Sequence, residues 1–495
     1  MLRRNIIANL FGRSWSLLLA VAVTPLYLYL LGIEAFGLIG LLTALQGVGG
    51  ILDLGLGLTL NRELARLSGE PDAATRQLDT LRTLEIVSWL VSIAGGIAIF
   101  FFADVIAEWL INPEKLSQQE TTNAIRWMGA ILALQLPFTF YQGGLMGLQS
   151  QVRANTVQAI TQTMRYAGGV AVLMLGSQTL FALLAWQCAS IAVGVVIMRA
   201  QLSRQLPPGR TAPAWRPQIL KQNYRFALTV ASNSVVGILH TQLDKFVVLK
   251  LLGLQQFAYY TIAVTGASVL WALIVPVGAA LFPRYAELLA QKDEIALGRL
   301  YHQACQLMAV LILPPLAALA LFSEPLLLAW THNPEVAKGA SVAIILIAVG
   351  TAMNGLSIAS TQLQSAAGWP QLVLTINIFA AMALVPAMMF GVGQFGLTGA
   401  ACVWVMLNSL YLLIGIPVMH RRLLRGHMRL WVVQDFAIPA AAITLFTIAA
   451  YFVVPLPDGV AQTLIAGFAV WSAASLVGLF AAPLIRRVAL SQLGF

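Results

Sequence analysis

The sequence predicts an all-α polytopic membrane protein with about fourteen transmembrane helices, arranged as two six-helix lobes and a C-terminal helix pair. Its composition is the first observation, since 59% of the 495 residues are hydrophobic, 10% are charged and the mean hydropathy is +0.82. A soluble domain carries about 25% charged residues. Soluble enzymes, disordered regulators and disulfide-rich secreted scaffolds are therefore excluded. The other two observations are the length of the apolar runs and the placement of basic residues between them.

The apolar runs are each about 20 residues long, which is enough to cross ~30 Å of hydrocarbon. A backbone in lipid has to satisfy its own polar groups, so each run is predicted to be a helix. The predicted helices span residues 11–31, 36–58, 83–103, 124–146, 156–175, 179–199, 223–250, 256–281, 301–322, 341–364, 371–391, 396–418, 434–454 and 461–484.

The distribution of Lys and Arg predicts the orientation of these helices. With the N-terminus in the cytoplasm, 23 of the 29 basic residues fall in cytoplasmic loops or at cytoplasmic helix ends. This is the positive-inside pattern, and with an even number of helices it also places the C-terminus in the cytoplasm. The net charge of +10 is therefore a topology signal, and no nucleic-acid partner is expected.

A basic segment with four prolines, residues 200–222, divides the predicted helices into two sets. A short internal repeat supports the division, because the Leu-Leu-Gly at 30–32 recurs at 251–253. Both halves hold an even number of helices and so share one orientation, which places a substrate site at their interface. The predicted domains are an N-lobe (1–199), a cytoplasmic linker (200–222), a C-lobe (223–418) and two further helices with a cytoplasmic tail (419–495).

No catalytic or metal-binding motif is found. The chain has neither a GxxxxGK[ST] phosphate loop nor an HExxH zinc motif. The three cysteines lie in apolar runs without metal-ligand spacing. Gly391-x-Gly393-x-x-Gly396 matches a dinucleotide-binding pattern by letter, but it lies in an expected outer turn without the strand that the motif needs. The sequence therefore predicts a protein that is not an enzyme and has no cofactor.

Polar side chains at helical spacing inside the predicted helices are the most informative feature. Such groups are costly in lipid and usually face a cavity or a partner. For any single Gln or Asn, hydrogen bonding between helices is the structural alternative. The stripes comprise Gln158, Gln162 and Arg165; Asn233, Gly237, His240 and Asp244, followed by Lys245; Gln46, Gly50 and Asp53; Asn354, Ser357, Thr361 and Gln364; and Gln135, Thr139 and Gln142.

The charged members of these stripes have competing interpretations. Arg165 lies about ten residues from either end of its helix, which favours a place in a hydrated cavity. Asp244 and Lys245 either neutralise each other or face that cavity, and Lys245 can also snorkel. His240 is a packed, hydrogen-bonded histidine or a proton carrier. Arg13 lies one turn into its helix, so snorkelling to the cytoplasmic surface competes with a cavity position.

Three segments resemble a known family. They are Leu-Tyr-Leu-Leu-Gly-x-x-x-Phe-Gly at 28–37, Leu-Asp-Leu-Gly-Leu-Gly at 52–57 and Gln-Leu-Asp-Lys-Phe at 242–246. With the layout over residues 1–418, they resemble the Wzx-type polysaccharide (O-antigen) precursor flippases of the MATE-like exporter superfamily. The resemblance implies two lobes around a central cavity that opens alternately to either side. It also implies a cargo of oligosaccharide repeat units on undecaprenyl pyrophosphate, moved between the leaflets of the bacterial inner membrane for surface polysaccharide synthesis.

The chemistry of that cargo assigns roles to the polar residues. Arginine presents a planar fork that suits phosphate oxygens, and neutral amides suit sugar hydroxyls. The candidate substrate-binding residues are Arg165, Lys245, Arg13, Gln158, Gln162, Gln142 and Asn354. The candidates for a coupling H+ or Na+ are Asp53, Asp244 and His240, and Pro25 is a candidate hinge, with a static kink as its alternative.

The expected partners are the lipid-linked glycan, membrane lipids and a polysaccharide polymerase. Two other functions stay open at this point. One is a cation-coupled multidrug exporter of the same superfamily, whose cationic substrates favour an acidic or aromatic cavity. The other is a non-transporting membrane subunit of the polysaccharide assembly machinery.

Overall fold

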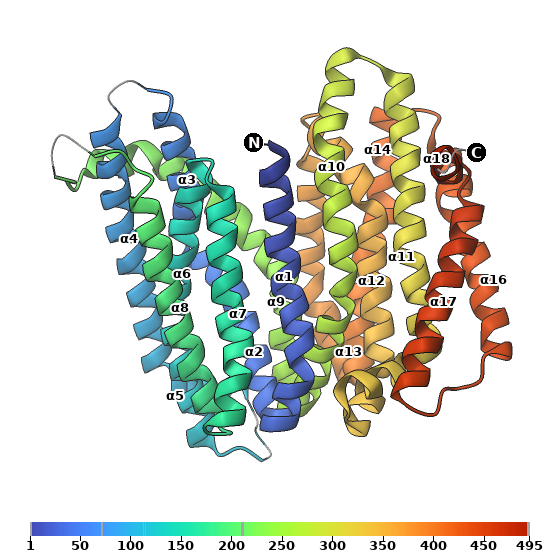
Figure 1. Ribbon diagram of the computed structural model, residues 1–495, viewed down its shortest axis with the longest axis horizontal. Helices are drawn as coiled ribbons and strands as arrows, with labels where there is room; N and C mark the ends of the chain where they lie inside the picture. Colours follow the sequence, from blue (N-terminus) through green and yellow to red (C-terminus); the bar gives the residue numbers. More distant parts are fainter. Residues whose placement is uncertain (1, 71–72, 112, 114, 209–211, 493–495) are drawn as a thin grey trace. The chain divides into compact units, whose positions relative to one another are not determined.

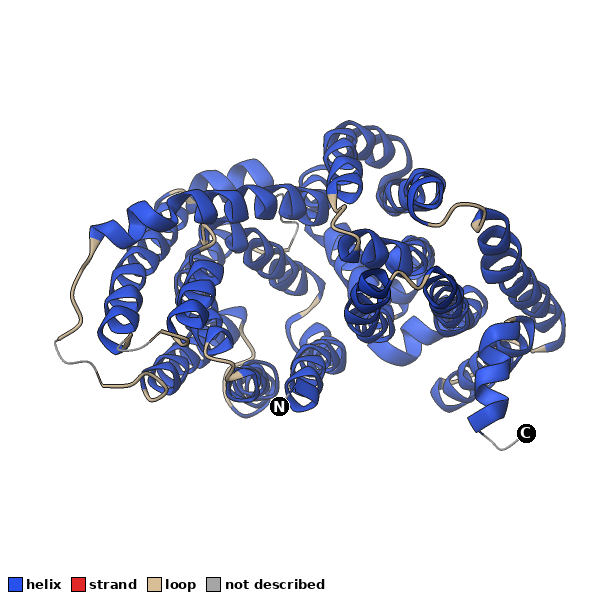
Figure 2. Cartoon of the chain, turned by 90° about the horizontal axis from the view of Figure 1, so that it is seen from above, coloured by secondary structure: helices blue, strands red, loops and turns tan. Residues whose placement is uncertain are grey.

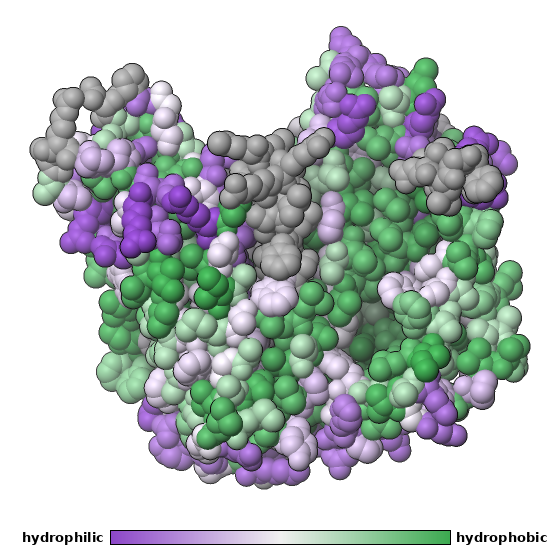
Figure 3. Space-filling view, viewed as in Figure 1, coloured by the Kyte–Doolittle hydropathy of each residue, from purple (hydrophilic) through white to green (hydrophobic). Residues whose placement is uncertain are grey.

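The computed structural model describes residues 2–492 apart from 71–72, 112, 114 and 209–211, and every regular element in this part of the chain is a helix (Figures 1 and 2). Ten of the described helices are long and apolar enough to cross a membrane. Apolar side chains form a band between hydrophilic ends in each half of the space-filling view (Figure 3). The all-α polytopic fold class is thereby confirmed, and the count of fourteen spans stays a prediction.

The chain divides into two compact units, Met1–Ala258 and Tyr259–Phe495. Within the first unit, α6 is the central helix and packs against α2, α3, α4, α5, α7 and α8. The helices of this unit are α1 (Leu2–Leu31), α2 (Ile33–Leu52), α3 (Leu56–Leu67), α4 (Ala74–Phe101), α5 (Ala103–Leu110), α6 (Gln118–Gly147), α7 (Gln151–Leu175), α8 (Leu180–Ser203) and most of α9 (Pro217–Ala267).

The second unit is built around α11 and α12, which pack against each other and against most of its other helices. It contains two π-helical segments, η1 and η2. After the end of α9, its elements are α10 (Val269–Gln291), α11 (Glu294–Thr331), α12 (Pro334–Ala366), α13 (Gln371–Leu410), η1 (Tyr411–Gly415), α14 (Ile416–Leu423), α15 (Met428–Leu430), η2 (Trp431–Ala437), α16 (Ile438–Val453), α17 (Val460–Ala481) and α18 (Pro483–Gln492).

The boundary between the units falls later than the proline-rich linker because α9 packs on the first unit. Arg62 of α3 donates to Asn223 Oδ1 at 3.1 Å, and Gly47 of α2 lies against the side chain of Gln242. The predicted lobes, divided at residues 200–222, are meant as the moving parts of a transporter and not as packing units. That division stays a prediction. The predicted break between 223–250 and 256–281 is confirmed, since Gly253 interrupts α9 with a φ of 77°.

One predicted helix is wrong. Residues 36–58 do not form a single helix, because α2 ends at Leu52 and α3 begins at Leu56. Leu54 and Gly55 have φ values of 47° and 70°, so the chain makes a left-handed turn that hydropathy does not reveal. The Asp53 carboxylate accepts the backbone N–H of Gly57 at 3.2 and 3.3 Å, which satisfies a donor in the first turn of α3. Within the predicted helix 256–281, a turn at Ser268 separates α9 from α10, but the backbone there keeps right-handed helical angles (φ −65°, ψ −16°).

Glycines set the spacing of α3 and α6. A Cβ at Gly143 would lie 2.4 Å from the carbonyl oxygen of Gly57, and one at Gly147 would lie 2.3 Å from that of Asn61. The two backbones therefore touch along one turn of each helix, as small residues allow in membranes.

A buried polar network attaches the C-terminal helices to the rest of the second unit. Asp435 of η2 is 2% exposed, and its carboxylate contacts His302 Nδ1 at 2.5 Å and accepts from Gln306 Nε2 at 3.0 Å. His302 Nε2 lies 2.9 Å from Nδ1 of His427, which precedes α15. Gln306 Oε1 also accepts the backbone N–H of Leu484 in α18 at 2.9 Å. Polar contacts thus connect α11 with η2, with α18 and with the turn before α15.

We expect Asp435→Ala to lower the thermal unfolding midpoint of the purified protein in detergent micelles. The substitution leaves His302 and Gln306 without their shared partner, and each unsatisfied buried group costs roughly 1–3 kcal/mol. Asp458→Ala, at an exposed position between α16 and α17, is the matched control. Equal midpoints for the two variants would show that the network does not stabilise the second unit.

Candidate functional site

Arg165 is a buried cation held by neutral amides from three helices. It lies near the middle of α7 and is 6% exposed. Its Nη1 donates to Gln162 Oε1 at 3.3 Å, one turn earlier on α7. Its Nη2 lies 3.1 Å from Oε1 of Gln187 on α8 and 3.5 Å from Oε1 of Gln46 on α2. The predicted Gln162–Arg165 pair is therefore present, with two further amides around it.

Aromatic side chains from α1 and α8 fix this part of α7. Tyr27 donates its hydroxyl to the carbonyl of Tyr166 at 3.0 Å, and Trp186 donates its indole N–H to the carbonyl of Met164 at 2.7 Å. Both rings reach the backbone because α7 has glycines there. A Cβ at Gly168 would lie 2.6 Å from Trp186 Nε1, and one at Gly169 would lie 2.5 Å from the Tyr27 hydroxyl. The backbone beneath Arg165 is thus positioned from both sides.

The charge of Arg165 has no counter-ion in the described part of the chain, where no carboxylate lies within 4.0 Å of its guanidinium. Its Nε atom is buried and has no hydrogen-bond partner there. An unpaired buried charge is unfavourable, and neutral acceptors compensate only part of its lost hydration. The group can therefore accept an anion, and its planar fork can bind two phosphate oxygens at once.

Gln142 and Gln158 form a separate pair close to this cluster. Gln142 Nε2 on α6 donates to Gln158 Oε1 on α7 at 2.6 Å. Gln158 lies one helical turn before Gln162 on the same face of α7. Its partner is Gln142, whereas the partner of Gln162 is Arg165. This contact is of the interhelical type that the structural interpretation of the stripe predicts. Sugar binding by either amide stays a prediction.

The remaining cationic and amide candidates lie elsewhere. Lys245 Nζ on α9 donates to Gln242 Oε1 at 2.6 Å and lies 3.4 Å from the carbonyl of Thr241. Asn354 belongs to the second unit, where its Nδ2 donates to Asn408 Oδ1 at 2.9 Å and joins α12 to α13. The side chain of Arg13 lies outside the described residues.

Of the candidate ion-coupling residues, Asp53 has the clearest structural role, as the carboxylate that accepts the N–H of Gly57 at the start of α3. Asp244 is buried on α9, at 8% exposure. The side chain of His240 lies outside the described residues.

The hinge candidate Pro25 lies inside α1, six residues before its end, and the hydroxyl of the adjacent Thr24 donates to the carbonyl of Ala20 at 2.8 Å.

Three members of the Arg165 cluster are not among the substrate-binding residues that the sequence predicts. Gln187 is an isolated amide in an apolar run, and the cost of such a group in lipid is the signal that could have selected it. Gln46 belongs to a predicted stripe on another helix. Tyr27 acts through its hydroxyl on the backbone of α7, and no sequence spacing indicates that contact.

Comparisons with known proteins agree with the fold. Residues 29–331 match a family model described as "Polysaccharide biosynthesis protein". A Shigella flexneri protein whose name assigns it, provisionally, as an O-antigen transporter is 23% identical over 424 residues, which cover 83% of this chain and 96% of that protein.

Two solved structures share the fold at low sequence identity. The lipid II flippase MurJ in an inward closed conformation has a TM-score of 0.74 and 13% identity, covering 95% of this chain and 97% of MurJ. An inward-facing multidrug resistance MATE family transporter of the MOP superfamily has a TM-score of 0.65 and 16% identity, covering 85% of this chain and 94% of that transporter.

Substitutions at Asp53 test its capping role. Asp53→Asn keeps a side-chain oxygen that can accept the N–H of Gly57, so we expect little change in the thermal midpoint in micelles. Asp53→Ala removes the acceptor, and loss of a helix-terminal cap costs about 0.5–2 kcal/mol, so its midpoint should fall. Equal midpoints for Asn and Ala would contradict capping. A sodium-dependent midpoint that is present in the wild type and absent in Asp53→Asn would assign the carboxylate to an ion instead.

Proposed function

This chain belongs to the polysaccharide biosynthesis protein family, and we propose that it is a flippase for lipid-linked oligosaccharides. It moves repeat units carried on undecaprenyl pyrophosphate from the cytoplasmic to the periplasmic leaflet of the bacterial inner membrane. The name of the Shigella flexneri relative and the shared fold with the lipid II flippase MurJ support this class of cargo. A buried arginine without a counter-ion in the described chain is the observation that carries the proposal.

The pyrophosphate accounts for the properties of Arg165. An anion bound there would supply the missing counter-charge in a surrounding of low dielectric, where attraction between charges is strong. Gln46, Gln162 and Gln187 hold the guanidinium without neutralising it. These amides also offer donors and acceptors to sugar hydroxyls next to the phosphates.

The wider transport machinery is part of the same proposal. Lys245 and Arg13 supply further positive charge, and Gln142, Gln158 and Asn354 supply amides, along a transport path that opens alternately to either side of the membrane. Pro25 lets α1 bend between the two states, because proline removes a backbone hydrogen bond. A coupling H+ or Na+ binds at Asp53, Asp244 or His240, and a polysaccharide polymerase receives the product.

Export of cationic drugs is disfavoured by the same charge. A cationic substrate would be repelled by a buried arginine whose partners are neutral, and the repulsion grows as the dielectric falls. The likeness to a multidrug transporter is one of fold, at 16% identity.

Replacing Arg165 tests the proposed cargo contact. We expect Arg165→Ala to abolish surface polymer in a strain that depends on this protein, while membrane abundance stays normal. A charge-assisted hydrogen bond contributes about 1.5–3 kcal/mol, or roughly ten- to a hundredfold in affinity. Arg165→Lys should restore part of the export, because the charge returns without the bidentate fork.

Arg153→Ala is the matched control, since Arg153 is exposed near the start of the same helix. Low abundance of both Arg165 variants would indicate a structural role. Full export by a well-expressed Arg165→Ala protein would contradict the proposed pyrophosphate contact.

Reporter fusions test the proposed orientation, in which both termini are cytoplasmic. Fusions after Ser68, Gln205 and Gly426 should give fluorescent green fluorescent protein and inactive alkaline phosphatase, because the basic residues around these loops resist translocation. A fusion after Asp458 should give the opposite result. A periplasmic signal at Gln205 would contradict an even number of spans before it and, with that, the two-lobe arrangement.

A further inference from the structure

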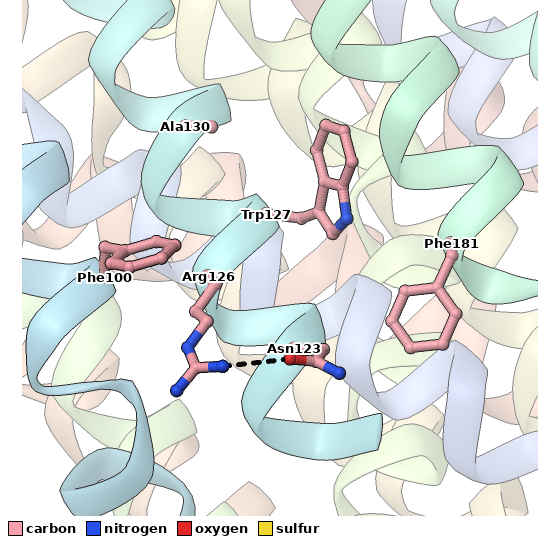
Figure 4. A pocket seen from close by; sticks show the side chains of 6 residues that line it. All are labelled: Phe100, Asn123, Arg126, Trp127, Ala130 and Phe181. Atoms are coloured by element: carbon pink, nitrogen blue, oxygen red, sulfur yellow. Dashed lines mark hydrogen bonds between the residues drawn. The ribbon is translucent and has the colours of Figure 1, made fainter. Parts of the chain in front are cut away.

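We propose that the first unit carries a binding site for a phospholipid whose headgroup has both a phosphate and a primary ammonium group, as in phosphoethanolamine lipids. The site is a cavity of about 540 Å³ between α4, α6 and α8, well apart along the chain from Arg165. Figure 4 shows Phe100 of α4 on one side and Phe181 of α8 on the other. The lining residues are Phe100, Asn123, Arg126, Trp127, Ala130 and Phe181.

Arg126 provides the phosphate contact. Its Nη1 donates to Asn123 Oδ1 at 3.1 Å, and its Nη2 pairs with Asp104 Oδ2 at 2.9 Å. The guanidinium carbon lies 5.3 Å from the centre of the Phe100 ring. The Nε atom is buried and has no hydrogen-bond partner among the described residues. The guanidinium is therefore oriented by three neighbours, and Nη1 and Nη2 each keep a second N–H that can donate to an anion.

Asp104 determines which headgroup fits. Its side chain is 58% exposed and pairs with Arg126, so a negative group lies next to the arginine that lines the cavity. A headgroup with net negative charge would place its charge close to this carboxylate. A headgroup with both a phosphate and an ammonium instead places its negative group beside Arg126 and its positive group beside Asp104. A primary ammonium also donates hydrogen bonds to a carboxylate, which the trimethylammonium of choline lipids cannot do.

The surface next to the cavity suits acyl chains. Leu90, Ile93 and Ile97 are exposed on α4 at intervals of three and four residues, and Phe100 continues the row into the cavity. Residues at this spacing share one face of a helix. Trp127 belongs to a residue type that is enriched at membrane interfaces, and Phe181 adds apolar surface.

In the proposed orientation the cavity lies in the periplasmic leaflet, since α4 ends and α6 begins there. The paired charges and the apolar row predict lipid binding whichever cargo the protein transports. Lipid binding therefore succeeds or fails separately from the proposed flippase activity.

Lipid binding to the purified full chain provides the test. Phosphatidylethanolamine, phosphatidylcholine and phosphatidylglycerol with identical acyl chains are added in turn to delipidated protein in micelles, and retention is measured by native mass spectrometry. We expect the wild type to retain phosphatidylethanolamine best. Arg126→Gln should reduce that retention roughly tenfold, because a charge-assisted contact is lost. Arg153→Gln, an exposed arginine on α7, should change nothing.

Asp104→Asn separates the two contacts, since it removes the ammonium partner and leaves Arg126 in place. We expect its preference to move from phosphatidylethanolamine to phosphatidylglycerol. Equal retention of the three lipids by the wild type would overturn the proposal, as would a wild-type preference for phosphatidylglycerol. The proposal would also be overturned if Arg126→Gln and Asp104→Asn both kept the wild-type order of lipid retention and the wild-type thermal midpoint. A selective lipid would then bind elsewhere.

Discussion

The burial of a positive charge among neutral side chains is the constraint that organises the first unit. Removing a charged group from water is costly unless the group is paired, and Arg165 is buried without a carboxylate in ion-pair distance among the described side chains. Three neighbouring features reduce that cost or fix its position: amides from α2, α7 and α8, aromatic contacts to the α7 backbone, and glycines that admit them. These neighbours position the guanidinium and leave its charge without compensation.

Hydropathy is sufficient to predict most helices, because a backbone in lipid has little choice of conformation. It fails where a local turn overrides a continuous apolar run, as at Leu54 and Gly55. That turn depends on backbone dihedral angles, which are not encoded in the average hydrophobicity of a window.

The candidate site is predictable to the extent that it lies on one helix. Gln162 and Arg165 are neighbours through helical periodicity alone, and the structure has them in contact. Gln187 and Tyr27 reach the same cluster from other helices, and such contacts depend on how helices pack. The second unit also contains a contact that periodicity cannot predict. His302 and Asp435 are 133 residues apart and meet only in the folded chain.

The contact between α3 and α6 has a consequence for the divergence of related chains. Gly143 and Gly147 bring two backbones together so closely that a single methyl group at either position would overlap a carbonyl oxygen of the neighbouring helix. Substitution there cannot be absorbed by a rotamer change, because the obstacle is main chain. A relative with alanine or a larger residue at these two positions has to carry α3 at a greater distance from α6. The pair can therefore serve as a marker, readable from an alignment, of which relatives keep this helix spacing and which have altered it.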